Sequence, residues 1–131
     1  MNLEDEVRER FMTDTRSILE GHLDDLEGMF QFHEDKSLEV LGEYRDLPPQ
    51  LQVLIHLIGR RYQSEADIAD SPALTNSALY RSFPGRDKST VRGYLMKLRE
   101  DGLARKREEG NEIVVERLQE AIEKIEKARG G

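Results

Sequence analysis

Cations, hydroxyl groups and one glycine share a short stretch late in the chain, KSTVRGYLMKLREDGLARK (residues 88–106). Val91, Leu95 and Leu98 are spaced i, i+4 and i+7, which predicts a helix with one buried face. Small, hydroxylated and basic side chains occupy much of the remaining surface. Such a helix suits insertion into the major groove of duplex DNA, where hydroxyl and guanidinium groups reach base edges. The alternative interpretation is a solvated surface helix.

Charge is segregated along the chain, whose net charge is −7. Residues 1–59 hold 5 Lys and Arg against 14 Asp and Glu, a net of −9. Residues 60–107 hold 11 against 6, a net of +5, and residues 108–131 hold 4 against 7, a net of −3. A basic middle between acidic ends is expected where one segment meets phosphates and the others do not.

The N-terminal part predicts a long helix, because a broad apolar stripe recurs between charged positions from Leu3 to about Phe30. Gly21 and Gly28 each weaken a helix by about 1 kcal/mol relative to Ala, so a bend or break near either is compatible with the pattern. Residues 37–44, SLEVLGEY, predict a further short helix.

The middle of the chain predicts several helices and a turn. Residues 49–61 predict a helix that begins at a Pro pair, and residues 64–70 predict a short one. A third helix is expected over residues 75–83, capped by Thr75. The tight turn PGRD (84–87) follows, and then the basic helix 88–101.

Gly102 ends the basic helix, because a C-terminal cap in the left-handed conformation needs no Cβ. A β-hairpin is expected next, with strands at 103–107 and 112–116 and Gly110-Asn111 in its turn. Further along, apolar residues spaced 3, 4 and 3 predict a coiled-coil-like seam on a final helix. Its members are Val115, Leu118, Ile122 and Ile125.

Leu79, Phe83, the turn 84–87 and KSTVRGYLMKLREDGL (88–103) together resemble winged helix-turn-helix transcriptional regulators of the broad MarR/PadR-like kind. The resemblance covers about residues 48–116. It implies a mainly α fold, with a winged helix-turn-helix domain and a two-stranded wing beside the long N-terminal helix and the C-terminal helix.

Three segments are then expected: a dimerisation or packing segment (1–47), a DNA-binding domain (48–116), and a C-terminal helix and tail (117–131). The first helix of the motif is either residues 75–83, with 64–70 additional, or residues 64–70 with an insertion after them. The offset of Leu79 and Phe83 from the turn favours the first arrangement.

In the DNA-binding interpretation, contacts follow from position along the motif. Base edges would be contacted by Ser89, Thr90, Arg92 and Gly93, with Arg92 suited to bidentate recognition of guanine. Gly93 either admits a close approach of the backbone or is a compromise of helix packing. Phosphates would be bound by Arg81, Arg86, Lys88, Lys97, Arg105, Lys106 and Arg107. Glu108 and Glu109 at the wing tip would repel phosphate.

A homodimer is expected, because one winged helix covers only a half-site and the flanking helices carry apolar stripes. Its interface is predicted to contain Val7, Phe11, Ile18, Leu26, Leu118, Ile122 and Ile125. The alternative is a monomer in which the N-terminal helices fold over the winged domain.

Other chemistry finds little support in the sequence. The chain has no cysteine, no apolar run near the ~20 residues of a membrane span and no signal-peptide pattern, so a cytoplasmic protein is expected. His22, His33 and His56 lack the spacing of a metal site. Without a phosphate loop or nucleophile motif, neither an enzyme nor a cofactor is expected.

Three functions follow from this pattern. The first is a sequence-specific regulator that binds double-stranded DNA. The second is a winged-helix protein–protein module of transcription, replication or segregation machinery, which the global acidity favours. The third is a non-specific architectural or single-strand binder, which the few aromatic residues disfavour. A small-molecule effector is compatible with a DNA-binding regulator, but no residue cluster in the sequence indicates which molecule it would be.

Overall fold

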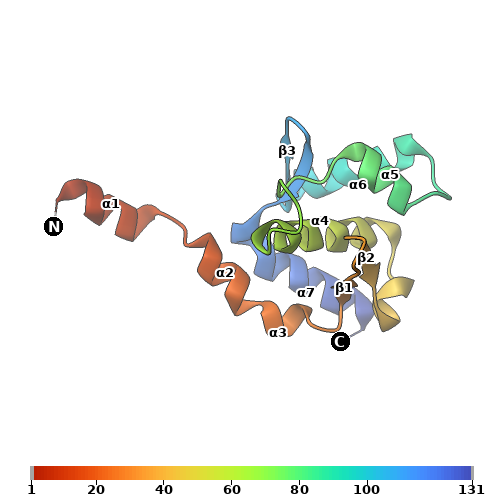
Figure 1. Cartoon of the computed structure of the whole chain (residues 1–131), viewed down its shortest axis with the longest axis horizontal. Coiled ribbons are helices and arrows are strands. Elements are labelled where there is room, and N and C mark those ends of the chain that lie inside the picture. The colour runs from red at the N-terminus through yellow and green to blue at the C-terminus, as the bar shows by residue number, and fades with distance from the viewer. Residues whose placement is uncertain (1, 131) are drawn as a thin grey trace.

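The computed structural model describes residues 2–130 and is mainly helical, with two small antiparallel sheets of two strands each (Figure 1). Helix α4 (Pro49–Glu65) runs through the middle. Helices α5 (Asn76–Ser82) and α6 (Lys88–Glu100) lie on one side of it, and α7 (Leu118–Arg129) lies on the other. None of the described helices has the length and apolar content to span a bilayer.

The N-terminal segment does not form one long helix: the pattern allowed the break after Gly21, but the break at residues 12–14 was not expected. The segment forms three short helices, α1 (Leu3–Phe11), α2 (Thr15–Gly21) and α3 (Leu23–Leu26). Met12 is extended, and Asp14 caps α2 by accepting a hydrogen bond of 3.1 Å from the amide of Ser17. A short polar side chain at this point satisfies the free amides of a new helix and so competes with continuation of the old one.

The prediction of a short helix over residues 37–44 is also wrong, because part of this segment belongs to a β-hairpin. Strands β1 (Phe30–Phe32) and β2 (Leu38–Val40) pair antiparallel, and a 3-10 turn, η1 (Gly42–Asp46), follows. The hairpin packs on α4 at Gly59, where an added Cβ would collide with Leu38 Cδ1. This contact joins residues 21 positions apart, beyond the reach of a periodicity argument.

The helix expected at residues 49–61 is confirmed and continues to Glu65. Pro49 stands in its first turn, where the missing N–H leaves no hydrogen bond unmade. The short helix expected at residues 64–70 does not form. Its first two residues belong to the end of α4, and Asp67 then adopts a positive φ of 59°. The chain crosses to α5 as a loop.

Helices α5 and α6 form where the sequence predicts them. The side chain of Thr75 caps α5 by accepting a hydrogen bond of 3.1 Å from the amide of Ala78. Asp87 occupies the cap position of α6 without a side-chain cap bond. Gly102 closes α6 at a φ of +78°. The helix that precedes the turn is therefore the Thr75 segment.

The hairpin after α6 is confirmed, but its turn is not. Strands β3 (Ala104–Arg107) and β4 (Gly110–Ile113) pair with Arg107 opposite Gly110, so Glu108 and Glu109 make the turn. Gly110 and Asn111 lie in β4 instead. A 3-10 turn, η2 (Val115–Arg117), then leads into α7.

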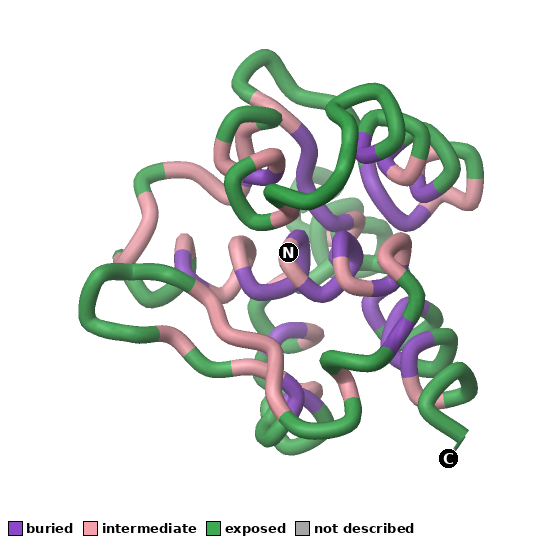
Figure 2. The backbone as a smooth tube through the Cα atoms, turned by 90° about the vertical axis from the view of Figure 1, so that its right-hand side faces the viewer, coloured by how far each residue is buried: buried purple, intermediate pink, exposed green. Residues whose placement is uncertain are grey.

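One hydrophobic core unites the three segments expected from the sequence. Figure 2 shows buried positions gathered along α4 and on the inward sides of the helices around it. The core takes Leu26 from the N-terminal segment and Leu118, Ile122 and Ile125 from α7. These four side chains are covered by their own chain, so their assignment to a dimer interface is corrected.

The remaining candidates for the dimer interface are placed differently. Phe11 is 78% exposed, Val7 is exposed beside it, and Ile18 is half-buried against the core. Helix α1 extends away from the rest of the molecule (Figure 1), so its apolar stripe stays uncovered.

Candidate nucleic-acid interface

Helix α6 turns one face to the core and the opposite face to solvent. Val91, Leu95 and Leu98 are buried, as their spacing predicts. The residues expected to contact bases are all exposed: Ser89, Thr90, Arg92 and Gly93. Met96 is 55% exposed on the same surface, an unusual position for a large apolar side chain.

Gly93 has no packing role within the described chain. A Cβ built at this position has no other residue within 4 Å, counting neither its chain neighbours nor the local helix backbone. Glycine inside a helix costs about 1 kcal/mol relative to alanine. Of the two interpretations of Gly93, packing against the chain itself is excluded, and an open surface is left at the middle of the exposed face.

Tyr80 of α5 sits beside two cations at the start of α6. The ammonium of Lys88 lies 5.7 Å from the centre of its ring, and Nη1 of Arg92 donates a hydrogen bond of 3.4 Å to its hydroxyl. Arg86, in the preceding turn, is exposed. Among residues 2–130, no carboxylate lies within salt-bridge distance of Arg86, Lys88 or Arg92.

Two other cations expected at phosphates are placed elsewhere or already paired. Arg81 lines a cleft between α4 and α5, together with His56 and Arg60. Lys97 forms an ion pair of 3.4 Å with Asp101. Arg86 and Lys88, at the start of α6, are therefore expected phosphate ligands that stay exposed and without a carboxylate partner among residues 2–130.

The arginines of β3 are paired within the hairpin. Glu112 is 5% exposed and lies 2.6 Å from Arg107 and 3.9 Å from Arg105. Arg105 also reaches Glu116 at 3.6 Å. Lys106 is exposed and, in the part of the chain that the structure describes, has no such partner.

The acidic turn of the hairpin is tied back to the loop before α5. Ser71 Oγ donates a hydrogen bond of 2.8 Å to Glu109. This bond holds the pKa of the Glu109 carboxyl below its usual value. The turn thus stays negatively charged, as the sequence predicts.

Asn111 joins the parts of this surface, a role that sequence reasoning missed by placing it in a turn. It is buried, its amide and carbonyl pair with Leu74, and its side chain bonds Arg99 of α6 and Asn76 of α5. The only sequence signal is an Asn next to Gly, which is equally typical of turns.

Comparison with known protein families, characterised proteins and solved structures finds no match. Within residues 2–130, no group of three or more His, Cys, Asp or Glu side chains is arranged to hold a metal ion. Burial lowers the pKa of His56 to about 4, and its ring meets that of Phe83 edge-on at 5.4 Å.

Proposed function

We propose that this chain is a sequence-specific regulator that binds double-stranded DNA, with α6 in the major groove. The observation that carries the proposal is the uncovered face of α6, with a hydroxyl pair, Arg92 and an unpacked glycine beside unpaired cations. A helix presented in this way has the dimensions and donors that major-groove recognition requires.

The order of elements supports a winged helix-turn-helix. Helix α4 is followed by a short bridge between Leu74 and Asn111, then by α5, the turn, α6 and the β3–β4 hairpin. In this arrangement α5 and α6 form the helix-turn-helix, and the hairpin is the wing. The wing is held against both helices through Asn111.

Four exposed residues of α6 contact the bases. Arg92 recognises guanine through its guanidinium group, while Ser89 and Thr90 can hydrogen-bond to the edges of different bases. Gly93 lets the helix backbone approach the groove closely, because nothing projects from that position.

Phosphate contacts come from cations that have no carboxylate partner among residues 2–130. These are Arg86, Lys88 and, on the wing, Lys106. Arg105 and Arg107 are paired with Glu112 and Glu116 and contribute less than the sequence alone predicts.

A homodimer completes the site, because two half-sites are needed for high specificity. The uncovered apolar stripe of α1 supports this step, since Leu3, Val7 and Phe11 are exposed at i, i+4 and i+8. A cytoplasmic location, with no cofactor and no catalytic activity, belongs to the same proposal.

A protein–protein module is the second candidate. Met96, the net charge of −7 and the two glutamates at the hairpin turn favour it over nucleic acid. In that case the outward face of α6 would dock an apolar partner surface instead of a groove.

Selection of bound fragments from a random duplex pool at two salt concentrations tests the proposal. The wild-type chain should enrich a palindromic motif, and Arg92→Ala should relax the preference at one position of each half-site. Arg16→Ala is the matched control, since Arg16 is exposed on α2 and distant in sequence from α6. Absence of any enriched motif overturns the proposal: no duplex binding at all then favours the protein-binding alternative, and binding without a motif favours a non-specific binder.

A further inference from the structure

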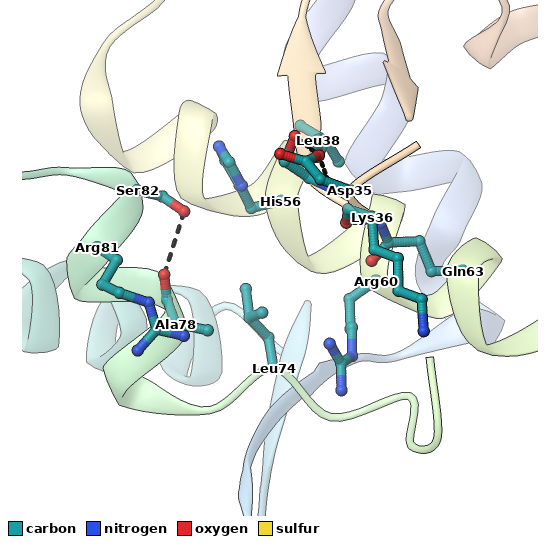
Figure 3. Close-up of a pocket in the computed structure, with 11 residues that line it drawn as sticks. Asp35, Lys36, Leu38, His56, Arg60, Gln63, Leu74, Ala78, Arg81 and Ser82 are labelled. Atoms are coloured by element: carbon teal, nitrogen blue, oxygen red, sulfur yellow. Dashed lines mark hydrogen bonds between the residues drawn. The ribbon is translucent and has the colours of Figure 1, made fainter. Parts of the chain in front are cut away.

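A cleft of about 630 Å³ lies between α4, α5 and the loop that joins β1 to β2 (Figure 3). Its walls come from segments far apart in the sequence: residues 35–38, three side chains of α4, Leu74, and three residues of α5. The volume is within the range of about 300–1,000 Å³ that small-molecule sites occupy.

Three cations line this cleft. Figure 3 shows Arg81 extending from α5 on one side of Leu74, with Arg60 and Lys36 on the other side. No carboxylate within residues 2–130 forms a salt bridge with any of the three. Their charge is available to a ligand.

The nearby carboxylates offset only part of this charge. Asp35 is engaged by its own loop, accepting hydrogen bonds from the amide of Ser37 at 3.0 Å and from its hydroxyl at 2.6 Å. Asp70 lines an adjoining hollow that shares Lys36 and Arg60 with the cleft. Counting the lining of the cleft alone, three cations stand against one carboxylate.

Hydrogen bonds hold the walls in place and leave the charged ends free. Gln63 Nε2 donates to the carbonyl of Lys36 at 2.8 Å, which fixes the loop on α4. Arg60 Nε donates to the carbonyl of Ser71 at 2.8 Å. The terminal nitrogens of Arg60 stay available, and His56 adds an uncharged ring to the wall.

We propose that this cleft binds a small organic anion carrying carboxylate or phosphate groups. A guanidinium presents paired donors to either group, and a concave wall concentrates the field of its cations. The chain as a whole is acidic, so its net charge repels anions and any binding must be local. The inference goes beyond the proposed DNA binding and does not depend on it.

Calorimetric titration tests the site at constant ionic strength, with citrate as the carboxylate probe, pyrophosphate as the phosphate probe and glycerol as the neutral control. At least one of the two anions should bind saturably at one site per chain, and glycerol should not. The double variant Lys36→Gln/Arg81→Gln should weaken that binding at least tenfold. Lys127→Gln removes an exposed cation on α7, which forms no ion pair in the described part of the chain, and should change that binding less than twofold.

Arg60 is kept in these variants because its Nε holds the Ser71 carbonyl, whereas no side-chain hydrogen bond of Lys36 or Arg81 is present in the described structure. A readout without any variant is the amide NMR shift of Ala78 and Ser82 when citrate or pyrophosphate is added.

Three outcomes overturn the inference. The first is the absence of saturable binding of both anions by the wild-type chain. The second is equal weakening by Lys127→Gln and the double variant. The third applies when the wild-type chain binds neither free anion and the double variant has lost affinity for duplex DNA. That result would assign the cleft cations to the nucleic-acid interface.

Discussion

Nη1 of Arg99 donates a hydrogen bond of 2.8 Å to Oδ1 of the buried Asn111, which connects α6 to the strand β4. The same side chain bonds Asn76, the first residue of α5, at 3.4 Å. One amide group therefore sets how the two helices sit against the hairpin.

Asn111→Ala should lower the free energy of unfolding by about 1–3 kcal/mol, because it removes a buried side chain that accepts a hydrogen bond from the charged Arg99 and donates one to Asn76. Gln119→Ala, at an exposed position of α7, should change it by less than about 0.5 kcal/mol. Urea denaturation measures both. Equal midpoints for the two variants would show that Asn111 does not act as a joint.

Gly93→Ala should move stability and DNA binding in opposite directions. A Cβ fits without contact in the free chain, so the fold should gain about 1 kcal/mol of stability. If the backbone approaches DNA at this point, affinity for the selected duplex should fall. Thermal denaturation and fluorescence anisotropy give the two values, and unchanged affinity would remove Gly93 from the interface.

The salt dependence of DNA binding should give the number of cations that contact phosphates. Arg86, Lys88 and Lys106 are the proposed phosphate ligands, three in each copy and six in a dimer. At about 0.9 per phosphate contact, the slope of log affinity against log salt should be about −5 for a dimer and about −3 for a monomer. Anisotropy titrations at several salt concentrations measure it, and a flat response would contradict the DNA-binding proposal.

His56 should make the protein less stable as the pH falls from about 6.5 towards 4. Burial lowers its folded-state pKa to about 4, so in this window the unfolded chain binds more protons than the folded chain. The free energy of unfolding then drops by at most about 1.4 kcal/mol per pH unit. Asp14, Asp35 and Glu39 have lowered pKa values and add their own loss below their normal range.

The contribution of His56 is separated from that of the carboxylates by comparing pH 6.5 with pH 5.5. His56→Gln should flatten the stability profile between these two values, as measured by urea denaturation. An identical slope in the variant would show that another group carries the dependence.

Phe11→Asp should weaken self-association while leaving the fold intact, because the Phe11 side chain is 78% exposed in one copy. Ala128→Asp introduces the same charge at an exposed position of α7 and should leave self-association unchanged. Sedimentation equilibrium measures both. A wild-type chain that stays monomeric at every concentration would overturn the α1 interface.

The sequence predicts the parts of the fold that depend on local spacing. The pattern of Val91, Leu95 and Leu98 correctly predicted which face of α6 is buried. Thr75 and Gly102 correctly marked where α5 begins and α6 ends, since caps act within a few residues.

Other features escaped prediction because they depend on contacts between distant residues. Leu38 fills the space left by Gly59, so a strand forms where the local pattern favoured a helix. The stripe of α7 looked like an interface between copies, but α4 and its neighbours cover it. Whether an apolar face meets its own chain or another copy is not encoded in its spacing.

By itself, the sequence determined the amphipathic helices, the basic middle of the chain and the hairpin after Gly102, because periodicity, charge and caps act over a few residues. Only the tertiary structure decided that Glu112 pairs with both Arg105 and Arg107, that Asn111 joins α5 to α6, and that Lys36, Arg60 and Arg81 share one cleft. Each of these depends on how separate elements pack, because the side chains that meet come from separate strands, helices and loops.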